Sequence, residues 1–439
     1  MSLWRDPTRR RWLGWFTLAT AFVLVNFHRV STGVLADDLT QVFDTSAAEL
    51  GLLHASFFYI YAPMQLVAGM LADQTGTRRV ATIGSLVMAV GVFGFAASDT
   101  YLAGFASRAL IGVGASVIYI ATLRFCANWF ETGEFATVAG MTLSASAVGG
   151  IIATTPLALF VADFGWRTAF LTVGAVGLVS TLAIFLVVRD DPADAGLDTI
   201  EGTADPPDLT PRETVDNARL VLSERETWVL GGMLFFVIGT NFTVMGLWGI
   251  PYLVQAYGLS VSEASVYTLL GNAGLVVGSP AMGWLSDYLG RRTGLIVAAG
   301  VVYTLAYALI AALETPPLAF VAAAFFTVMF LLGGFTIAYT VVRERFHGSV
   351  SGTATGAVNA LGFFGGAIFP AVLGAALDAY WTGELVAGSR VYSLFGYRVA
   401  FGIAALNGLI ALGCAVWLHR RETADATPEG SETATAGSQ

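Results

Sequence analysis

The sequence contains no lysine, and all 22 of its basic residues are arginine. Charge of either sign is scarce, because only 12% of the 439 residues are charged whereas 56% are hydrophobic. A water-soluble fold of this length needs more charge on its surface, so the composition excludes a soluble protein. The 31 acidic residues give a net charge of −9, which argues against a nucleic-acid partner.

Cysteine and catalytic motifs are also scarce. Cys126 and Cys414 lie far apart in apolar runs, so neither a disulfide framework nor a metal site follows from them. The sequence has no Walker lysine motif, no zinc-ligand spacing and no nucleophile elbow. We therefore expect neither an ATP-driven machine nor an enzyme, and we expect no cofactor.

Long apolar runs are what the sequence has in abundance. A helix of about 20 apolar residues crosses a hydrocarbon core of about 30 Å. Such runs lie near 12–36, 49–72, 80–98, 101–123, 134–161, 167–188, 227–256, 263–285, 293–313, 317–341, 350–377 and 397–419. They predict an all-α polytopic membrane protein with twelve transmembrane helices.

One long polar segment divides these runs into two sets of six. We expect residues 1–188 to form an N-terminal six-helix bundle and residues 227–420 to form a C-terminal one. Residues 189–226, rich in proline and acidic residues, are the predicted linker between them. Residues 421–439 have no apolar residue larger than alanine, and we expect a disordered tail there.

The arginines predict the orientation in the membrane. With the N-terminus inside, only Arg167, Arg390 and Arg398 fall in outer loops, whereas the inner loops carry most of the others. We therefore expect a multi-pass protein of the cell membrane whose N-terminus, linker and C-terminus are cytoplasmic.

The two halves repeat each other. "GMLADQTGTRR" at 69–79 recurs as "GWLSDYLGRRT" at 283–293. The same offset relates Ser46 and Glu49, the pattern of a helix capping box, to Ser260 and Glu263. Parallel repeats of six helices predict two bundles related by a pseudo-two-fold axis.

The repeated loop carries a family resemblance. It resembles the motif between the second and third helices of the major facilitator superfamily, with one copy at Gly69, Asp73, Gly76, Arg78 and Arg79 and a second at Gly283, Asp287, Gly290, Arg291 and Arg292. Arg108 in "SRALIGVGAS" resembles the fourth-helix arginine motif of that superfamily, so the resemblance covers residues 12 to 420. Within the superfamily, "FHRVSTGVLADDL" is most similar to the sugar-phosphate-permease and organic-anion symporter branches.

The resemblance implies gating residues. It implies that Asp73 and Asp287 hold the two bundles together in one of two alternating states. Arg78, Arg79, Arg291 and Arg292 would hold the turns at the anionic headgroups, although a plain positive-inside turn is the alternative. Gly348, Gly352 and Gly356 recur every four residues, which indicates close helix packing that lets the bundles rock.

His28 and Arg29 lie well inside the first run, where a charge costs a few kcal/mol or more. A planar fork of donors suits a carboxylate, and the resembling anion carriers place an arginine at this point. The alternative for Arg29 is snorkelling outward or capping a carbonyl. The repeat places Thr243, beside Asn241, where the phosphate carriers of the resembling branch have a second arginine. The resemblance therefore favours a monocarboxylate or another singly charged anion over a phosphate ester.

Other polar residues are candidates for a central cavity, with packing as the alternative. The substrate-binding candidates besides Arg29 and His28 are Tyr59, Tyr61, Gln65, Arg108, Asn241, Thr243 and Asn359, and Trp248, Asn272 and Tyr339 could also line the cavity. Arg108 could instead bridge helix ends to carbonyls. No acidic residue lies deep in a run, so a carboxylate proton relay is not expected, and only His28 and His54 could titrate there.

We therefore expect a secondary active transporter that moves a small organic anion by alternating access. Two alternatives stay open: a transporter-like sensor that binds a solute without moving it, and a carrier of zwitterions such as small peptides. The expected partners are the solute, the lipid bilayer and a coupling ion, either a proton or sodium. We expect the protein to be a monomer.

Overall fold

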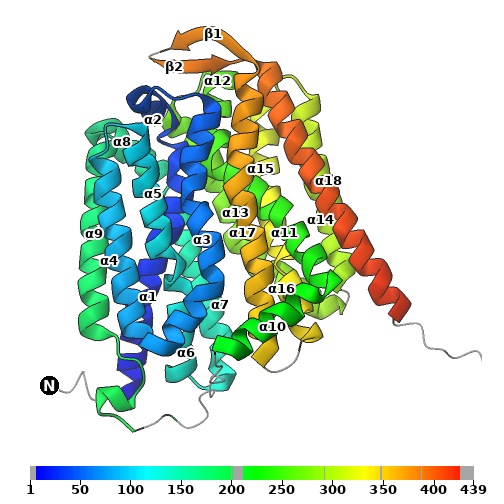
Figure 1. Ribbon diagram of the computed structural model, residues 1–439. Coiled ribbons are helices and arrows are strands. Elements are labelled where there is room, and N and C mark those ends of the chain that lie inside the picture. The colour runs from blue at the N-terminus through cyan, green and yellow to red at the C-terminus, as the bar shows by residue number, and fades with distance from the viewer. Residues whose placement is uncertain are drawn as a thin grey trace, which may run out of the picture.

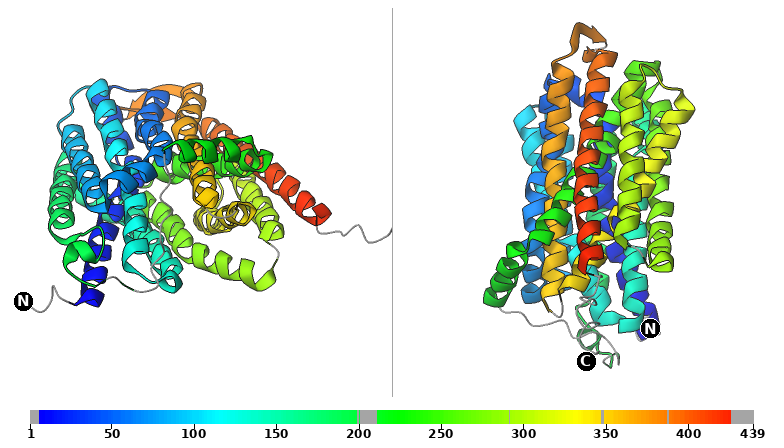
Figure 2. Two further views of the ribbon diagram at one scale, coloured as in Figure 1. Left: turned by 60° about the horizontal axis from the view of Figure 1, so that its bottom comes forward. Right: turned by 90° about the vertical axis from the view of Figure 1, so that its right-hand side faces the viewer.

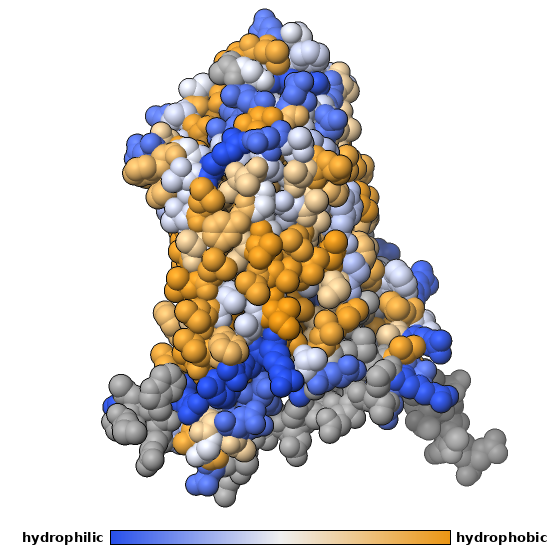
Figure 3. Space-filling view, turned by 60° about the vertical axis from the view of Figure 1, so that its left-hand side comes forward, coloured by the Kyte–Doolittle hydropathy of each residue, from blue (hydrophilic) through white to orange (hydrophobic). Residues whose placement is uncertain are grey.

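The structure is a computed structural model, and it describes residues 6–198, 200, 211–290, 292–346, 349–386 and 388–425. Nearly all described residues are helical, and the helices form two bundles that stand side by side (Figure 1). The face shown in Figure 3 carries an apolar band between two more polar ends, as expected for a protein surrounded by lipid.

The first bundle is built from six membrane-crossing segments, three of which are interrupted. The segments are α1 (Pro7–Val30) with η1 (Ser31–Gly33), α3 (Ala47–Thr75), α4 (Thr77–Ala96), α5 (Tyr101–Ser116) with α6 (Ile118–Trp129), α7 (Thr132–Ile152) with α8 (Thr155–Phe164), and α9 (Trp166–Val187).

The second bundle repeats this arrangement. Its segments are α11 (Arg225–Thr243) with the π-helical turn η3 (Val244–Trp248) and α12 (Gly249–Tyr257), α13 (Val261–Leu289), α14 (Arg292–Ala312), α15 (Leu318–Phe335) with α16 (Ala338–Arg345), α17 (Ser349–Asp378), and α18 (Leu394–Asp425).

The predicted architecture of twelve helices in two bundles is confirmed. Within the described residues, ten segments are long and apolar enough to cross a membrane. The other two crossings are α3 and α13, which are 29 residues long each and occupy equivalent places in the two halves. Both begin with the predicted capping box, in which the backbone N–H groups of Glu49 and Glu263 donate to Ser46 and Ser260 at 3.2 Å.

Several elements were not predicted. A short helix α2 (Ala36–Phe43) and a hairpin of β1 (Trp381–Val386) and β2 (Ser389–Tyr392) cover one end of the molecule, which we call the hairpin end (Figure 1). The start of α1 and the end of α18 lie at the opposite end, which we call the terminus end (Figure 2).

The predicted linker and tail also contain helix. The linker includes η2 (Ala193–Ala195) and the amphipathic helix α10 (Pro211–Ser223), which buries Val221 and lies at the terminus end against α17. Since α18 continues to Asp425, the prediction of disorder from residue 421 is wrong for its first five residues. The rest of the predicted tail lies outside the described residues.

Candidate substrate site

Arg29 lies at the boundary between the two bundles, in the last turn of α1, and only 4% of its surface is exposed. Its guanidinium carbon is 4.4 Å from the ring centroid of Tyr61 and 4.8 Å from that of Phe363. The rings of Phe242 and Phe22 follow at 5.9 and 6.0 Å. We call these four rings the aromatic cage. Tyr61 and Phe22 belong to the first bundle and Phe242 and Phe363 to the second, so the cage exists only where the bundles meet.

The guanidinium has no counter-ion among the described residues, because no ion pair involves Arg29. Its Nε and Nη2 atoms are buried without a hydrogen-bond partner. The cage faces stabilise the charge by roughly 0.5–2 kcal/mol each. They do not satisfy the N–H groups of Nε and Nη2, which remain available to a carboxylate or another planar anion.

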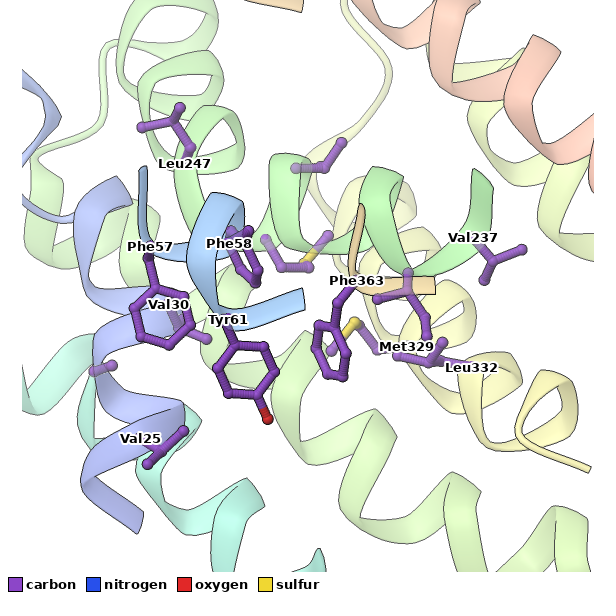
Figure 4. Packing of buried hydrophobic residues seen from close by; sticks show 14 of the residues in the cluster. Val25, Val30, Phe57, Phe58, Tyr61, Val237, Leu247, Met329, Leu332 and Phe363 are labelled. Atoms are coloured by element: carbon purple, nitrogen blue, oxygen red, sulfur yellow. The ribbon is translucent and has the colours of Figure 1, made fainter. Parts of the chain in front are cut away.

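A second layer of rings surrounds the cage. Phe57 stacks on Tyr61 with centroids 5.4 Å apart, and Phe58 lies 5.3 Å from Phe242. Tyr61 and Phe363 meet edge to face at 4.9 Å, and Figure 4 shows these two rings side by side across the boundary. The surroundings of Arg29 are therefore aromatic and contributed by both bundles.

A chain of polar groups crosses the same boundary near the cage. The Tyr339 hydroxyl donates to Asn359 Oδ1 at 2.7 Å, and Asn359 Nδ2 donates to Gln65 Oε1 at 3.4 Å. Gln65 in turn donates to the Ser116 carbonyl at 3.3 Å, where α5 ends. Because Gln65 follows Tyr61 by four residues on α3, both project from one face of the helix. The structure thus brings together Arg29, Tyr61, Gln65 and Asn359 from the predicted set.

Three other candidates are placed elsewhere. Tyr59 is 39% exposed and packs beside Phe105 of α5. Asn241 accepts from the Tyr307 hydroxyl at 3.3 Å and Thr243 donates to a carbonyl of its own helix, so both make contacts inside the second bundle. Phe242 between them reaches the cage instead. Phe22, Phe242 and Phe363 could not be predicted from the sequence, because phenylalanine in an apolar run carries no distinct signal.

His28 and Arg108 lie within the first bundle. Arg108 Nη2 donates to the His28 carbonyl at 3.2 Å, and the Arg108 guanidinium carbon is 5.6 Å from the Phe95 ring. The last carbonyls of a helix lack helical donors, so Arg108 satisfies an open group at the end of α1. The His28 ring lies 6.0 Å from that of Phe170. These contacts match the structural alternative given for Arg108.

Two of the gating candidates, Arg78 and Arg292, contact residues of their own half of the chain. Arg78 donates through Nε to the Phe185 carbonyl at 2.8 Å, and its backbone N–H donates to Asp190 at 2.7 Å. Arg292 pairs with Glu344 of α16. Arg79 and Asp287 are exposed, whereas the Asp73 side chain and Arg291 lie outside what the structure describes.

The two bundles meet tightly at the hairpin end. Asp378, at the end of α17, accepts from the backbone N–H groups of Ala47 and Ala48 at 2.9 and 2.8 Å, which caps the start of α3. An added Cβ at Gly51 would lie 2.3 Å from the Pro370 carbonyl oxygen. Arg390 of the hairpin contacts the Asp378 carboxylate at 3.4 Å.

The predicted packing at Gly352 and Gly356, toward the terminus end of α17, is not made. Nothing lies within 4 Å of an added Cβ at either glycine, so the prediction of close packing there is wrong for this conformation. Gly348 lies outside the described residues. The close contacts described between the bundles are thus those at the cage, those of the polar chain beside it and those toward the hairpin end.

Comparison with known families shows to which family this chain belongs. The sequence profile of the Major Facilitator Superfamily matches residues 13–370 and 232–438. The chain belongs to the Major Facilitator Superfamily. The predicted resemblance is confirmed, and so is the expectation that the protein is a transporter and not an enzyme.

Several relatives are named as transporters. A probable nitrate/nitrite transporter of Mycobacterium tuberculosis is 31% identical over 82% of this chain and 88% of its own length. A probable sulfoacetate transporter of Cupriavidus necator is 28% identical over 66% of this chain and 67% of its own. A gentisate transporter of Corynebacterium glutamicum is 27% identical over 93% and 87%, respectively.

The same fold is found in a crystal structure of a bacterial homologue of the human lysosomal transporter Spinster, in an inward-facing and unoccupied conformation. It superposes with a TM-score of 0.77 at 18% identity and covers 95% of this chain and 98% of that one. The similarity shows that the two proteins share a fold.

Proposed function

We propose that this superfamily member is a secondary active transporter for a small carboxylate-bearing organic anion. The observation that carries the proposal is Arg29, a buried cation that has no counter-ion among the described residues and lies inside a cage that both bundles build. A buried charge in a membrane protein marks a substrate or ion pathway by default. The relatives named for sulfoacetate and gentisate support an organic acid.

The geometry suits alternating access. The cage lies between the bundles, and the Asp378 cap with the close approach at Gly51 closes the hairpin end. The arginine bias assigns the terminus end to the cytoplasm, so this conformation corresponds to the state closed toward the outside. Release of those contacts at the hairpin end would open the cage toward the outside. A proton or sodium gradient would drive accumulation.

Nitrate is the second candidate substrate. The 31% identical relative is named for nitrate and nitrite, and a guanidinium can also bind a planar inorganic anion. Among the described residues Arg29 is the one cation inside the aromatic cage, and one cation suits either a monocarboxylate or nitrate better than a doubly charged phosphate ester.

Uptake into proteoliposomes tests the proposal. The purified protein is offered labelled carboxylates, nitrate, phosphate esters, peptides and sugars under imposed proton or sodium gradients. The proposal predicts accumulation of a carboxylate by the wild type and none by Arg29→Gln. Binding without accumulation would identify a sensor and contradict the proposal, and accumulation of peptides or sugars alone would contradict the substrate class.

A further inference from the structure

We infer that the transported anion carries one carboxylate on a flat apolar body, with an aromatic ring as the best fit. This inference rests on the proposed function and names the substrate class of the same site. Three observations carry it. Arg29 is the one unpaired cation that the described residues place in the aromatic cage, aromatic rings form the walls of the site, and helices of both bundles carry these rings.

The charges at the site limit the substrate to one anionic group. Arg29 is the cation inside the cage, and its Nε and Nη2 atoms are unpaired. The residue at the equivalent point of the second half is Thr243, whose hydroxyl donates to the Gly239 carbonyl at 2.7 Å. Arg108 contacts the His28 carbonyl inside the first bundle. A second carboxylate or a phosphate dianion would lie against rings, where the described residues offer no second cation to pair with it.

The walls of the site favour a substrate with an aromatic body. The cage has four rings, and Phe57 and Phe58 lie directly behind it. Gln65 and Asn359 lie one helical turn from Tyr61 and Phe363, and they already bond to each other and to Tyr339. A sugar acid would leave several hydroxyl groups without partners against these rings, which costs binding free energy for each. A flat apolar ring makes offset-stacked or edge-to-face contacts with the same walls.

The cage also explains how such a ligand would act on both bundles. Tyr61 and Phe363 lie edge to face at 4.9 Å in the present conformation, so a ligand ring enters when these two rings separate. The ligand then replaces one aromatic contact with two, one to each bundle, while its carboxylate binds Arg29. Binding is thereby coupled to the relative position of α3 and α17, which carry the two rings.

The test compares two acids that differ in flatness. Benzoate and cyclohexanecarboxylate have one carboxylate on a six-carbon ring, but only benzoate is flat and aromatic. Binding is measured calorimetrically on the purified full chain, and accumulation is measured in proteoliposomes with nitrate, hexanoate and glucuronate as further probes. We expect benzoate to bind at least about tenfold more tightly than cyclohexanecarboxylate and to accumulate.

Variants connect the preference to the cage. Phe363→Leu removes a cage ring, and we expect it to reduce the preference for benzoate to less than about threefold. Phe364→Leu is the matched control, because Phe364 is the next residue of α17 and is 37% exposed, so its loss leaves the preference unchanged. Phe242→Leu supplies a second cage variant if Phe363→Leu does not fold.

The outcomes separate the inference from the function beneath it. Equal affinity for benzoate and cyclohexanecarboxylate, both abolished in Arg29→Gln, would overturn the inference and leave the proposed carboxylate transporter intact. Tighter binding of glucuronate or hexanoate than of benzoate would overturn it in the same way. Accumulation of nitrate with no carboxylate would overturn both, and benzoate binding without accumulation would support the site chemistry while overturning transport.

Discussion

The carboxylate of Asp378, at the end of the eleventh crossing segment, accepts a hydrogen bond from the backbone N–H of Ala47 at 2.9 Å. The contact joins two residues 331 positions apart and closes the hairpin end of the molecule. A carboxylate at a helix N-terminus is stabilised by unpaired N–H groups and by the helix dipole. The bond therefore contributes to the stability of the conformation that is closed at the hairpin end, and its partners belong to different bundles.

Asp378→Asn should weaken this closure, because charge-assisted bonds to the start of α3 become neutral ones. A loss of about 1.4 kcal/mol would raise the population open at the hairpin end about tenfold. A single cysteine in place of Thr40, in a chain freed of Cys126 and Cys414, reports the opening through its rate of labelling by a membrane-impermeant maleimide. The control is Asp44→Asn, because Asp44 is exposed at the same end. An unchanged labelling rate in Asp378→Asn would contradict this role.

Gly51→Ala should hinder the same closure through sterics. The added Cβ would lie 2.3 Å from the Pro370 carbonyl oxygen, a distance that forces two backbones apart. We expect faster cysteine labelling and slower transport than in the wild type. Gly402→Ala is the control, since nothing lies within 4 Å of its Cβ, and equal behaviour of the two variants would show that the approach is not required.

Stability at the hairpin end should depend on pH through Asp37. Burial raises the pKa of the Asp37 carboxyl, and a hydrogen bond from Ser389 partly opposes the rise. Burial and the charge of Asp37 raise the pKa of Asp38, and Arg390 and Tyr392 line the same small cavity as Asp37. For an acid whose pKa rises on folding, the contribution to stability is present below the ordinary aspartate value and is lost as pH increases through the raised value.

Melting temperatures measured across that interval check the sign. The wild type should lose stability as pH rises from just below the ordinary aspartate pKa toward neutrality, and Asp37→Asn should reduce this loss. A wild type that gains stability over the same interval through Asp37 would contradict the effect of burial.

Tags should establish the orientation. The arginine bias predicts that tags at the N-terminus, near residue 205 and at the C-terminus are all cytoplasmic. Protease protection in right-side-out vesicles reports each position separately. An outward-facing tag at any of the three would refute the proposed topology and the assignment of the hairpin end to the outside.

Much of the fold could be predicted because a membrane permits few alternatives. Backbone groups in lipid must be satisfied within helices, so long apolar runs translate directly into crossing segments. The runs at 49–72 and 263–285 became Ala47–Thr75 and Val261–Leu289, in which the capping boxes fixed the starts. The breaks at Ser31–Gly33 and Val244–Trp248 could not be predicted, because an interrupted apolar run reads the same as a continuous one.

The candidate site could be predicted only at the residue whose burial in the membrane costs free energy. Arg29 was identified from one charge at membrane depth, whereas its neighbours Phe242 and Phe363 are two of 30 phenylalanines in an apolar chain. Asp378 was missed because an acid at the end of a run also fits an ordinary loop. Phe242, Phe363 and Asp378 differ from similar residues only in their tertiary contacts between the bundles, and no local sequence pattern predicts those contacts.

The central claim is that Arg29 is kept in the membrane for the anion that it binds. Thermal melts of the wild type, Arg29→Lys and Arg29→Gln, each with and without the carboxylate that the uptake panel selects, test it most directly. Lysine keeps the charge but loses the planar fork, so its affinity should fall by roughly 1–3 kcal/mol, and glutamine should nearly abolish ligand stabilisation. Without ligand, Arg29→Gln should melt no lower than the wild type, because an unpaired buried charge has been removed. The opposite pattern, a lower melting temperature of ligand-free Arg29→Gln together with unchanged ligand stabilisation, would show that Arg29 is structural and would contradict the account.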